Sequence, residues 1–109
     1  KQRLPRHIRM KDHRAFGLGA IYEPGEVPTV SLITIAANAV ISDFHDRMPV
    51  IVPPAHQARW LDVDSPDPAA LLLPYDADAM EAYPVSTRVN GVKDDDPSLV
   101  VPERQGLFG

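Results

Sequence analysis

The stretch that decides the fold is His-Asp-Arg-Met-Pro-Val-Ile-Val at residues 45–52. Its last three residues are apolar and β-branched, which predicts a short buried strand ended by the two prolines at 53–54. Polar groups directly before a buried strand are costly unless they are paired or face a cleft. Imidazole transfers protons near neutral pH, and guanidinium binds phosphate. His45 and Arg47 therefore indicate a site for proton transfer on a phosphate-linked substrate.

The residues alone leave a purely structural interpretation open. Asp46 and Arg47 could form a local ion pair, with His45 capping the C-terminal end of a helix. A metal-dependent phosphohydrolase is disfavoured, because the other histidines (His7, His13 and His56) show no ligand spacing. We accordingly expect no metal and no cofactor.

Upstream of this segment the sequence predicts mainly strands. Residues 29–36 are rich in β-branched side chains and predict a buried strand. Asn38 is a candidate cap for a short helix to about Phe44. Residues 6–10 alternate between polar and apolar, as in a half-buried strand. Residues 15–22 contain two glycines and predict a strand that another backbone approaches closely.

Downstream of this segment the predicted elements are short, since prolines recur throughout the chain. Residues 55–61 predict one or two helical turns, with Trp60 and Leu61 packed inward. A second short helix is expected over 67–73, a strand over 80–87 and a polar loop over 90–97. Together these patterns predict an α+β fold with short helices and mostly antiparallel strands.

Composition removes several classes of function. The 109 residues contain no cysteine, which excludes disulfides, thiolate metal ligands and a thiol nucleophile within them. The serines lack the glycines of a nucleophile elbow, and Gly17-Leu18-Gly19 is not a complete dinucleotide-binding motif. No apolar run is long enough to span a bilayer, and the start does not resemble a signal peptide. We expect a cytoplasmic protein without a membrane partner.

Charge is unevenly distributed along the chain. The net charge is −4, yet residues 1–14 hold six basic side chains against one acidic one. Such a basic arm can steer a polyanion locally. The alternative is a charged strand edge that discourages aggregation, and charge alone favours this alternative.

Several segments, taken in order, resemble the SRAP family (SOS response-associated peptidase). A strand with a threonine followed by an Ala/Asn segment occupies residues 32–38, and the signature His-Asp-Arg-Met-Pro occupies residues 45–49. An Arg-Trp-Leu element follows at 59–61, and Tyr-Pro-Val-Ser-Thr-Arg-Val-Asn at 83–90 resembles a late family segment. The ordered set covers most of residues 1–102.

The resemblance implies a fold, an activity and a partner. The fold would be α+β, with a curved, barrel-like, mostly antiparallel sheet, short helices and a DNA groove. Family members bind single-stranded DNA and capture abasic sites. Their N-terminal cysteine attacks the ring-opened aldehyde with its thiol and amine and closes a thiazolidine. The same cysteine is implicated in self-cleavage of a leader residue, hence the family's classification as a peptidase.

The resemblance also implies roles for three residues. His45 matches the active-site histidine, which contacts the sugar and assists proton transfer. Arg47 matches an arginine that contacts the DNA backbone, and Thr34 matches a hydroxyl beside the lesion.

Two family residues are absent. There is no cysteine, and the catalytic glutamate of a Tyr-Glu-Trp segment has no counterpart, because Tyr22-Glu23-Pro24 follows the wrong strand. Residues 1–109 are therefore expected to be the C-terminal part of a single SRAP domain, inactive alone. The missing upstream half would have roughly 100 residues, since a small isolated piece buries little core. The alternatives are a non-covalent single-stranded DNA-binding module and an inactive structural fragment.

Overall fold

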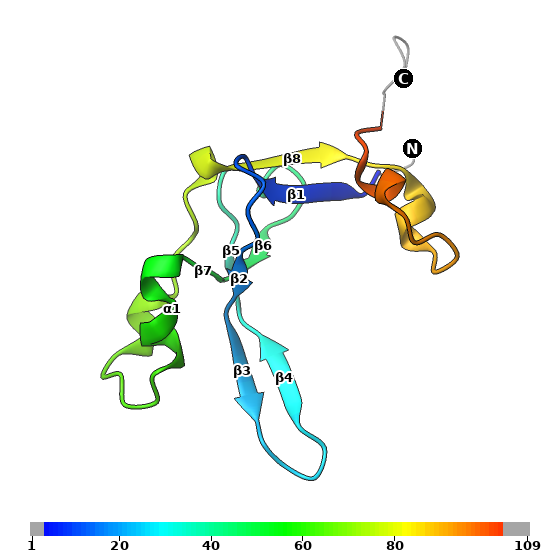
Figure 1. Ribbon diagram of the computed structural model, residues 1–109. Coiled ribbons are helices and arrows are strands. Elements are labelled where there is room, and N and C mark those ends of the chain that lie inside the picture. The colour runs from blue at the N-terminus through cyan, green and yellow to red at the C-terminus, as the bar shows by residue number, and fades with distance from the viewer. Residues whose placement is uncertain (1–3, 104–109) are drawn as a thin grey trace.

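The computed structural model describes residues 4–103 and has an α+β architecture (Figure 1). Its elements are β1 (Arg6–Met10), β2 (Gly17–Leu18), β3 (Ala20–Glu23), β4 (Thr29–Leu32), β5 (Thr34–Ala36), β6 (Arg47–Pro49), β7 (Ile51–Val52), α1 (Pro54–Leu61), the 3-10 helices η1 (Pro68–Leu71) and η2 (Ala77–Ala79), β8 (Met80–Pro84), and the 3-10 helices η3 (Thr87–Asn90) and η4 (Pro97–Val100). No helix in the described part of the chain is long and apolar enough to cross a membrane.

The strands pair in four antiparallel ribbons: β1 with β8, β2 with β7, β3 with β4, and β5 with β6. The predicted α+β class and antiparallel pairing are confirmed. Over residues 4–103 the ribbons do not close into a barrel.

Three long strand segments cross at one point, where each changes its partner. Gly19 lies between β2 and β3, Ile33 between β4 and β5, and Val50 between β6 and β7. Their backbones form a ring of hydrogen bonds: Gly19 donates to Val50 (2.7 Å), Val50 to Ile33 (2.9 Å) and Ile33 to Gly19 (3.0 Å). A β-carbon at Gly19 would lie 3.3 Å from both Trp60 and Val50. The close approach predicted for this glycine-containing segment is thus present at Gly19.

The main core lies beside this crossing, beneath the β1–β8 ribbon. It contains all three methionines of the chain together with two isoleucines. The buried cluster consists of Met10, Ile41, Met48, Ile51 and Met80. Methionine suits irregular spaces because its unbranched thioether side chain adapts its shape to its neighbours. This core directly underlies the loop that carries His45.

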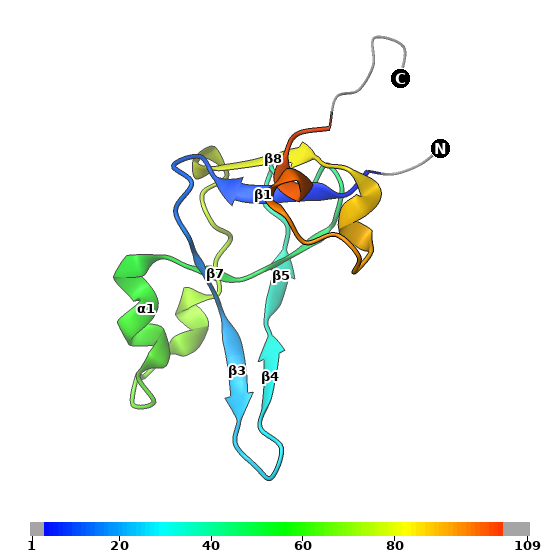
Figure 2. The same cartoon turned by 45° about the vertical axis from the view of Figure 1, so that its right-hand side comes forward.

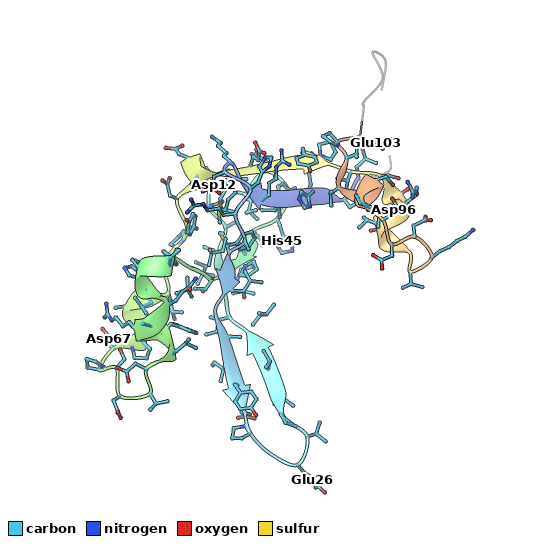
Figure 3. The ribbon with its side chains drawn as sticks, viewed as in Figure 1. Asp12, Glu26, His45, Asp67, Asp96 and Glu103 are labelled. Atoms are coloured by element: carbon cyan, nitrogen blue, oxygen red, sulfur yellow. The ribbon has the colours of Figure 1, made fainter. Side chains whose placement is uncertain are left out.

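The β3–β4 hairpin projects away from the core (Figures 1 and 2). Glu26, at its tip, lies far from His45 (Figure 3). All four residues of β4 are exposed, and residues 33–36 alternate between half-buried and exposed, so the predicted burial of the strand over residues 29–36 is wrong along its whole length. The β-branched side chains do form the strand as propensity indicates, but no described segment covers it.

The C-terminal elements follow the predictions in type more than in length. Helix α1 spans the expected turns, but Leu61 is exposed, whereas it was expected to pack inward. Residues 68–71 form a 3-10 helix where a longer helix over 67–73 was expected. Strand β8 ends at Pro84, although a strand to residue 87 was expected, because the chain turns into η3.

Arg88 organises the polar loop predicted over residues 90–97. It binds Asp94 (3.1 Å) and Asp96 (3.3 Å), and its Nη1 donates to Ser98 Oγ. Hydrogen bonds from the hydroxyl and backbone N–H of Ser98, helped by Arg88, hold the pKa of Asp96 below its usual range. The hydrogen bond with Asp94 and the charge of that carboxylate raise the pKa of Arg88. The acidic run is therefore tied to a guanidinium within the loop.

Candidate functional site

A tight turn between β5 and β6 delivers His45 to the surface. Residues 39–44 form turns rather than the predicted helix, and the side chain of Asn38 accepts hydrogen bonds from the backbone N–H groups of Val40 and Ile41. The predicted capping by Asn38 is therefore present, but Asn38 caps a turn and not a helix. The last hydrogen bond of this turn runs from the N–H of His45 to the carbonyl of Ile41 (2.9 Å). The segment is too short to develop a helix before β6 begins.

The imidazole of His45 is held at one nitrogen. Its Nδ1 lies 3.0 Å from the backbone nitrogen of Arg47 and 2.9 Å from the carbonyl oxygen of the same residue. Nδ1 can thus accept from the N–H when unprotonated, or donate to the carbonyl when protonated. Among residues 4–103 no hydrogen-bond partner engages Nε2, and the side chain is 64% exposed. The ring can consequently gain or lose a proton at Nε2 without losing its anchor.

The side chain of Arg47 reaches across to the neighbouring strand. Its Nη2 donates to the carbonyl of Thr34 (2.7 Å) and to the Thr34 hydroxyl (3.2 Å). In the described residues it forms no ion pair with a carboxylate. The Asp46–Arg47 ion pair of the structural interpretation is therefore not formed. Arg47 retains a net positive charge and free N–H donors for a ligand.

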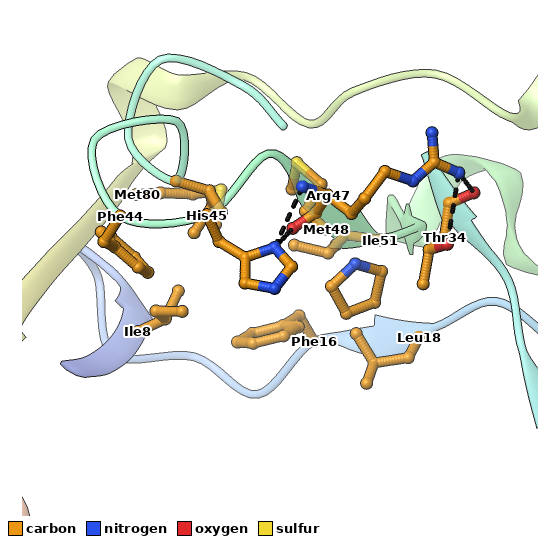
Figure 4. Close-up of a pocket in the computed structure, with 12 residues that line it drawn as sticks. Ile8, Phe16, Leu18, Thr34, Phe44, His45, Arg47, Met48, Ile51 and Met80 are labelled. Carbon is orange, nitrogen blue, oxygen red and sulfur yellow. Dashed lines mark hydrogen bonds between the residues drawn. The ribbon is translucent and has the colours of Figure 1, made fainter. Parts of the chain in front are cut away.

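The three sequence-predicted residues line one hollow, here called the His45 hollow (Figure 4). It has a volume of about 460 Å³. Its lining consists of Ile8, Phe16, Leu18, Thr34, Ile41, Phe44, His45, Arg47, Met48, Pro49, Ile51 and Met80. The floor is apolar, and His45, Arg47 and Thr34 are its polar members. Such a site suits a ligand with an apolar or planar part and a charged or hydroxylated part.

The basic arm is neutralised only in part where it is described, because ion pairs form at Arg9 and Arg14 but not at Arg6 or Lys11. Arg9 pairs with Glu81 across the β1–β8 ribbon, Arg14 lies 3.9 Å from Asp12, and the Arg6 guanidinium lies over the ring of Phe44. The predicted positions Lys1 and Arg3 lie outside the described residues. Over residues 4–103 no cluster of three or more histidine, cysteine or acidic side chains could hold a metal ion.

Sequence reasoning missed the wall of the hollow that faces His45. Phe16 and Leu18 come from the segment around β2, and Ile8 comes from β1 (Figure 4). The alternation in residues 6–10 did indicate that Ile8 faces inward. Nothing local in the sequence shows that Phe16 and Leu18 lie opposite a histidine about thirty positions later, because only the strand crossing brings them together.

Comparison with known proteins gives consistent results. The family described as SOS response associated peptidase (SRAP) matches residues 1–92. The abasic site processing protein YoqW of Bacillus subtilis is 38% identical, over 92% of this chain and 49% of its own length. The abasic site processing protein HMCES of Gallus gallus is 36% identical, over 72% of this chain and 24% of its length.

Solved structures extend the comparison to the fold. The crystal structure of a protein from Bacteroides thetaiotaomicron superposes with a TM-score of 0.81 at 27% identity. The match covers 93% of this chain and 49% of that one. The chain therefore spans about half the length of YoqW and of this structural neighbour.

Proposed function

The chain belongs to the SRAP family, and from this premise we propose that residues 1–109 act as the C-terminal part of a single SRAP domain that binds single-stranded DNA and captures abasic sites covalently. The observation that carries the proposal is the convergence of His45, Arg47 and Thr34 on one hollow. The names of the relatives support abasic sites as the target. Autoproteolytic removal of a leader residue belongs to the same proposal.

The nucleophile must come from outside these residues, because the chain contains no cysteine. We propose that a preceding half supplies an N-terminal cysteine and the catalytic glutamate. The cysteine thiol and amine then add to the ring-opened aldehyde of an abasic site and close a thiazolidine with loss of water. The matches to YoqW and to the Bacteroides thetaiotaomicron structure each cover about half of the other protein, which supports a two-part site.

His45 is the proposed proton-transfer group for this condensation and its reversal. Loss of water requires a proton on the departing oxygen, and reopening the ring requires proton transfer to the thiazolidine. The Nε2 of His45 can give or take that proton, because Nδ1 is satisfied by Arg47 in either state. Thr34 and Arg47 border the same hollow, where the guanidinium can bind a phosphate beside the lesion.

The first experiment measures covalent adducts on an abasic single-stranded oligonucleotide with the full-length protein. We expect an adduct on the abasic strand, none on the matched intact strand, and none with residues 1–109 alone. Absence of any adduct with the full-length protein, under conditions where it is folded, would contradict the proposed covalent function.

A second experiment separates binding from chemistry. Affinity for intact single-stranded DNA should fall as salt rises, because phosphate contacts release counterions. Arg47→Ala removes the proposed contact between the guanidinium and a DNA phosphate, and it should weaken DNA binding by about 1–3 kcal/mol. Arg59→Ala is the matched control, since that exposed arginine on α1 lies outside both the hollow and the basic arm at residues 1–14. Equal affinities for the two variants would remove Arg47 from the proposed interface.

A further inference from the structure

One buried polar side chain has no part in the function proposed above. Asn38 is 9% exposed, and among the residues that the structure describes it is the only buried polar residue. Burying an amide is costly unless its donors and acceptors are satisfied. The contacts that satisfy it therefore indicate what it holds in place.

The amide of Asn38 is fully engaged. Its Oδ1 accepts from the N–H groups of Val40 and Ile41, both at 3.2 Å. Its Nδ2 donates to the carbonyl of Tyr75 (2.9 Å) and to the sulfur of Met80 (3.3 Å). Two acceptor and two donor positions are thus filled, as the chemistry of an amide allows. An aspartate would place an oxygen against the Tyr75 carbonyl, and an apolar residue would leave the turn uncapped.

These bonds continue to His45 within one turn. Oδ1 fixes the N–H of Ile41, and the carbonyl of Ile41 accepts from the N–H of His45 (2.9 Å). The backbone N–H of Ala37 closes the same loop on the carbonyl of Asp46 (3.0 Å). Ile41 itself is buried in the methionine cluster. The backbone of His45 is therefore attached to the core through Asn38 and Ile41.

We propose that Asn38 is a positioning residue for His45. Through the turn at residues 38–46 it keeps Nδ1 against the Arg47 backbone, so that Nε2 remains available at the His45 hollow. The catalytic consequence rests on the proposed function, whereas the effect on the imidazole does not. Asn38 lies in the Ala/Asn segment at residues 32–38, seven positions before the histidine.

The first test records the ring ¹⁵N shifts of His45 in the full-length protein, assigned by their loss in His45→Gln. In Asn38→Ala the shifts should move toward those of an unconstrained histidine, because Nδ1 loses its fixed neighbours. His7, His13 and His56 serve as internal references. Ser42→Ala is the matched control, since that exposed residue makes one side-chain bond in the same turn, to the carbonyl of Ala39. Val85→Ala, in a buried site outside the cluster, controls for lost stability.

The second test measures the rate of abasic-site adduct formation. Asn38→Ala should slow it about tenfold or more, with affinity for intact single-stranded DNA changed less than about threefold. If wild type forms no adduct, the proposed function fails while the ¹⁵N result still decides the role of Asn38.

A second variant tests the proposal if Asn38→Ala does not fold. If Asn38→Ala is unfolded, Asn38→Ser decides, because its hydroxyl can cap the turn but is too short to reach Tyr75 and Met80. We expect His45 shifts between those of wild type and free histidine. Wild-type His45 shifts in the folded Ala variant, or in the Ser variant where the Ala variant is unfolded, would overturn the proposal.

Discussion

The strand segments at residues 48–52 and 29–32 are both rich in apolar or β-branched residues, yet only the first of these segments is largely buried. Val50 is 0% exposed and Ile51 4%, whereas Val30 is 65% exposed and Leu32 55%. Both segments are strands that meet at the same crossing, so local propensity does not explain the difference. The first is covered by β1, β8 and the turn that carries His45, and no described segment covers the second. Burial here is decided by what packs on a strand.

The overall dimensions agree with this contrast. The Cα radius of gyration is 16.7 Å, compared with about 13 Å for a compact chain of 100 residues. Exposed apolar strands are a liability in an isolated domain. An uncovered hairpin is what we expect if a preceding half of the domain completes the fold.

The largest effect should come from the buried segment. Met48→Ala removes a side chain that is 2% exposed from the centre of the cluster. It should lower the free energy of unfolding by about 2–5 kcal/mol, through lost burial and the cavity that remains. Urea unfolding of residues 1–109 measures it.

The same experiment on the hairpin sharpens the comparison. Val30→Ala should change the stability of residues 1–109 by less than about 0.5 kcal/mol, because the side chain is already in water. In the full-length protein, Val30→Ala should lower the free energy of unfolding by more than this if another segment covers the hairpin. Equal costs for Met48→Ala and Val30→Ala in the short chain would contradict the contrast.

An effect between those of Met48→Ala and Val30→Ala is expected at the crossing. Gly19→Ala puts a β-carbon 3.3 Å from Val50, which is fully buried and has little room to move. Overpacking of this kind should outweigh the entropy gained in the unfolded chain and cost about 1 kcal/mol. Trp60, the only tryptophan, should report the strain through its fluorescence. Gly25→Ala in the open hairpin is the control, and a stabilised Gly19→Ala would show that the crossing is loosely packed.

The smallest effect is expected from the exposed loop around Arg88. Because the pKa of Asp96 is lowered in the folded state, its contribution to stability is present above the usual aspartate pKa of about 3.9. That contribution is lost as the pH falls below this value, through the lowered pKa. Melting temperatures of wild type and Asp96→Asn should therefore differ slightly at pH 7 and converge toward pH 2. A difference in melting temperature that stays constant from pH 7 to pH 2 would show that ionisation of Asp96 does not contribute to stability.

Sequence patterns predicted the strands well where the periodicity was local. The alternation in residues 6–10 predicted β1, and the apolar run at 50–52 predicted the buried strand that forms β7. Helix α1 begins at Pro54, one residue before the helical turns expected from residue 55. The helix after Asn38 was wrong, because capping residues do not show how soon β6 must begin. The predicted burial of residues 29–36 was wrong because propensity contains no information about what covers a strand.

The candidate site was predicted in part. The sequence selected His45, Arg47 and Thr34, and the structure brings them to one hollow. Their proposed roles in DNA capture remain predictions. The opposite wall, with Phe16 and Leu18, and the link from Asn38 to His45 depend on non-local packing and could be seen only in the fold.

The most direct test of the account is a time course of adduct formation and reversal on an abasic oligonucleotide at several pH values. It compares wild type, His45→Gln and Asp43→Asn in the full-length protein, with thermal melting as a stability control. Asp43 is the matched neighbour because its side chain is exposed two residues from His45, whereas the carboxylate of Asp46 lies 3.7 Å from Nδ1 of His45 and is unsuitable as a control. We predict that His45→Gln changes one of the rates by about 10²-fold or more. Asp43→Asn should behave as wild type. Equal rates for His45→Gln and wild type at every pH would contradict the assignment of His45 as the proton-transfer group.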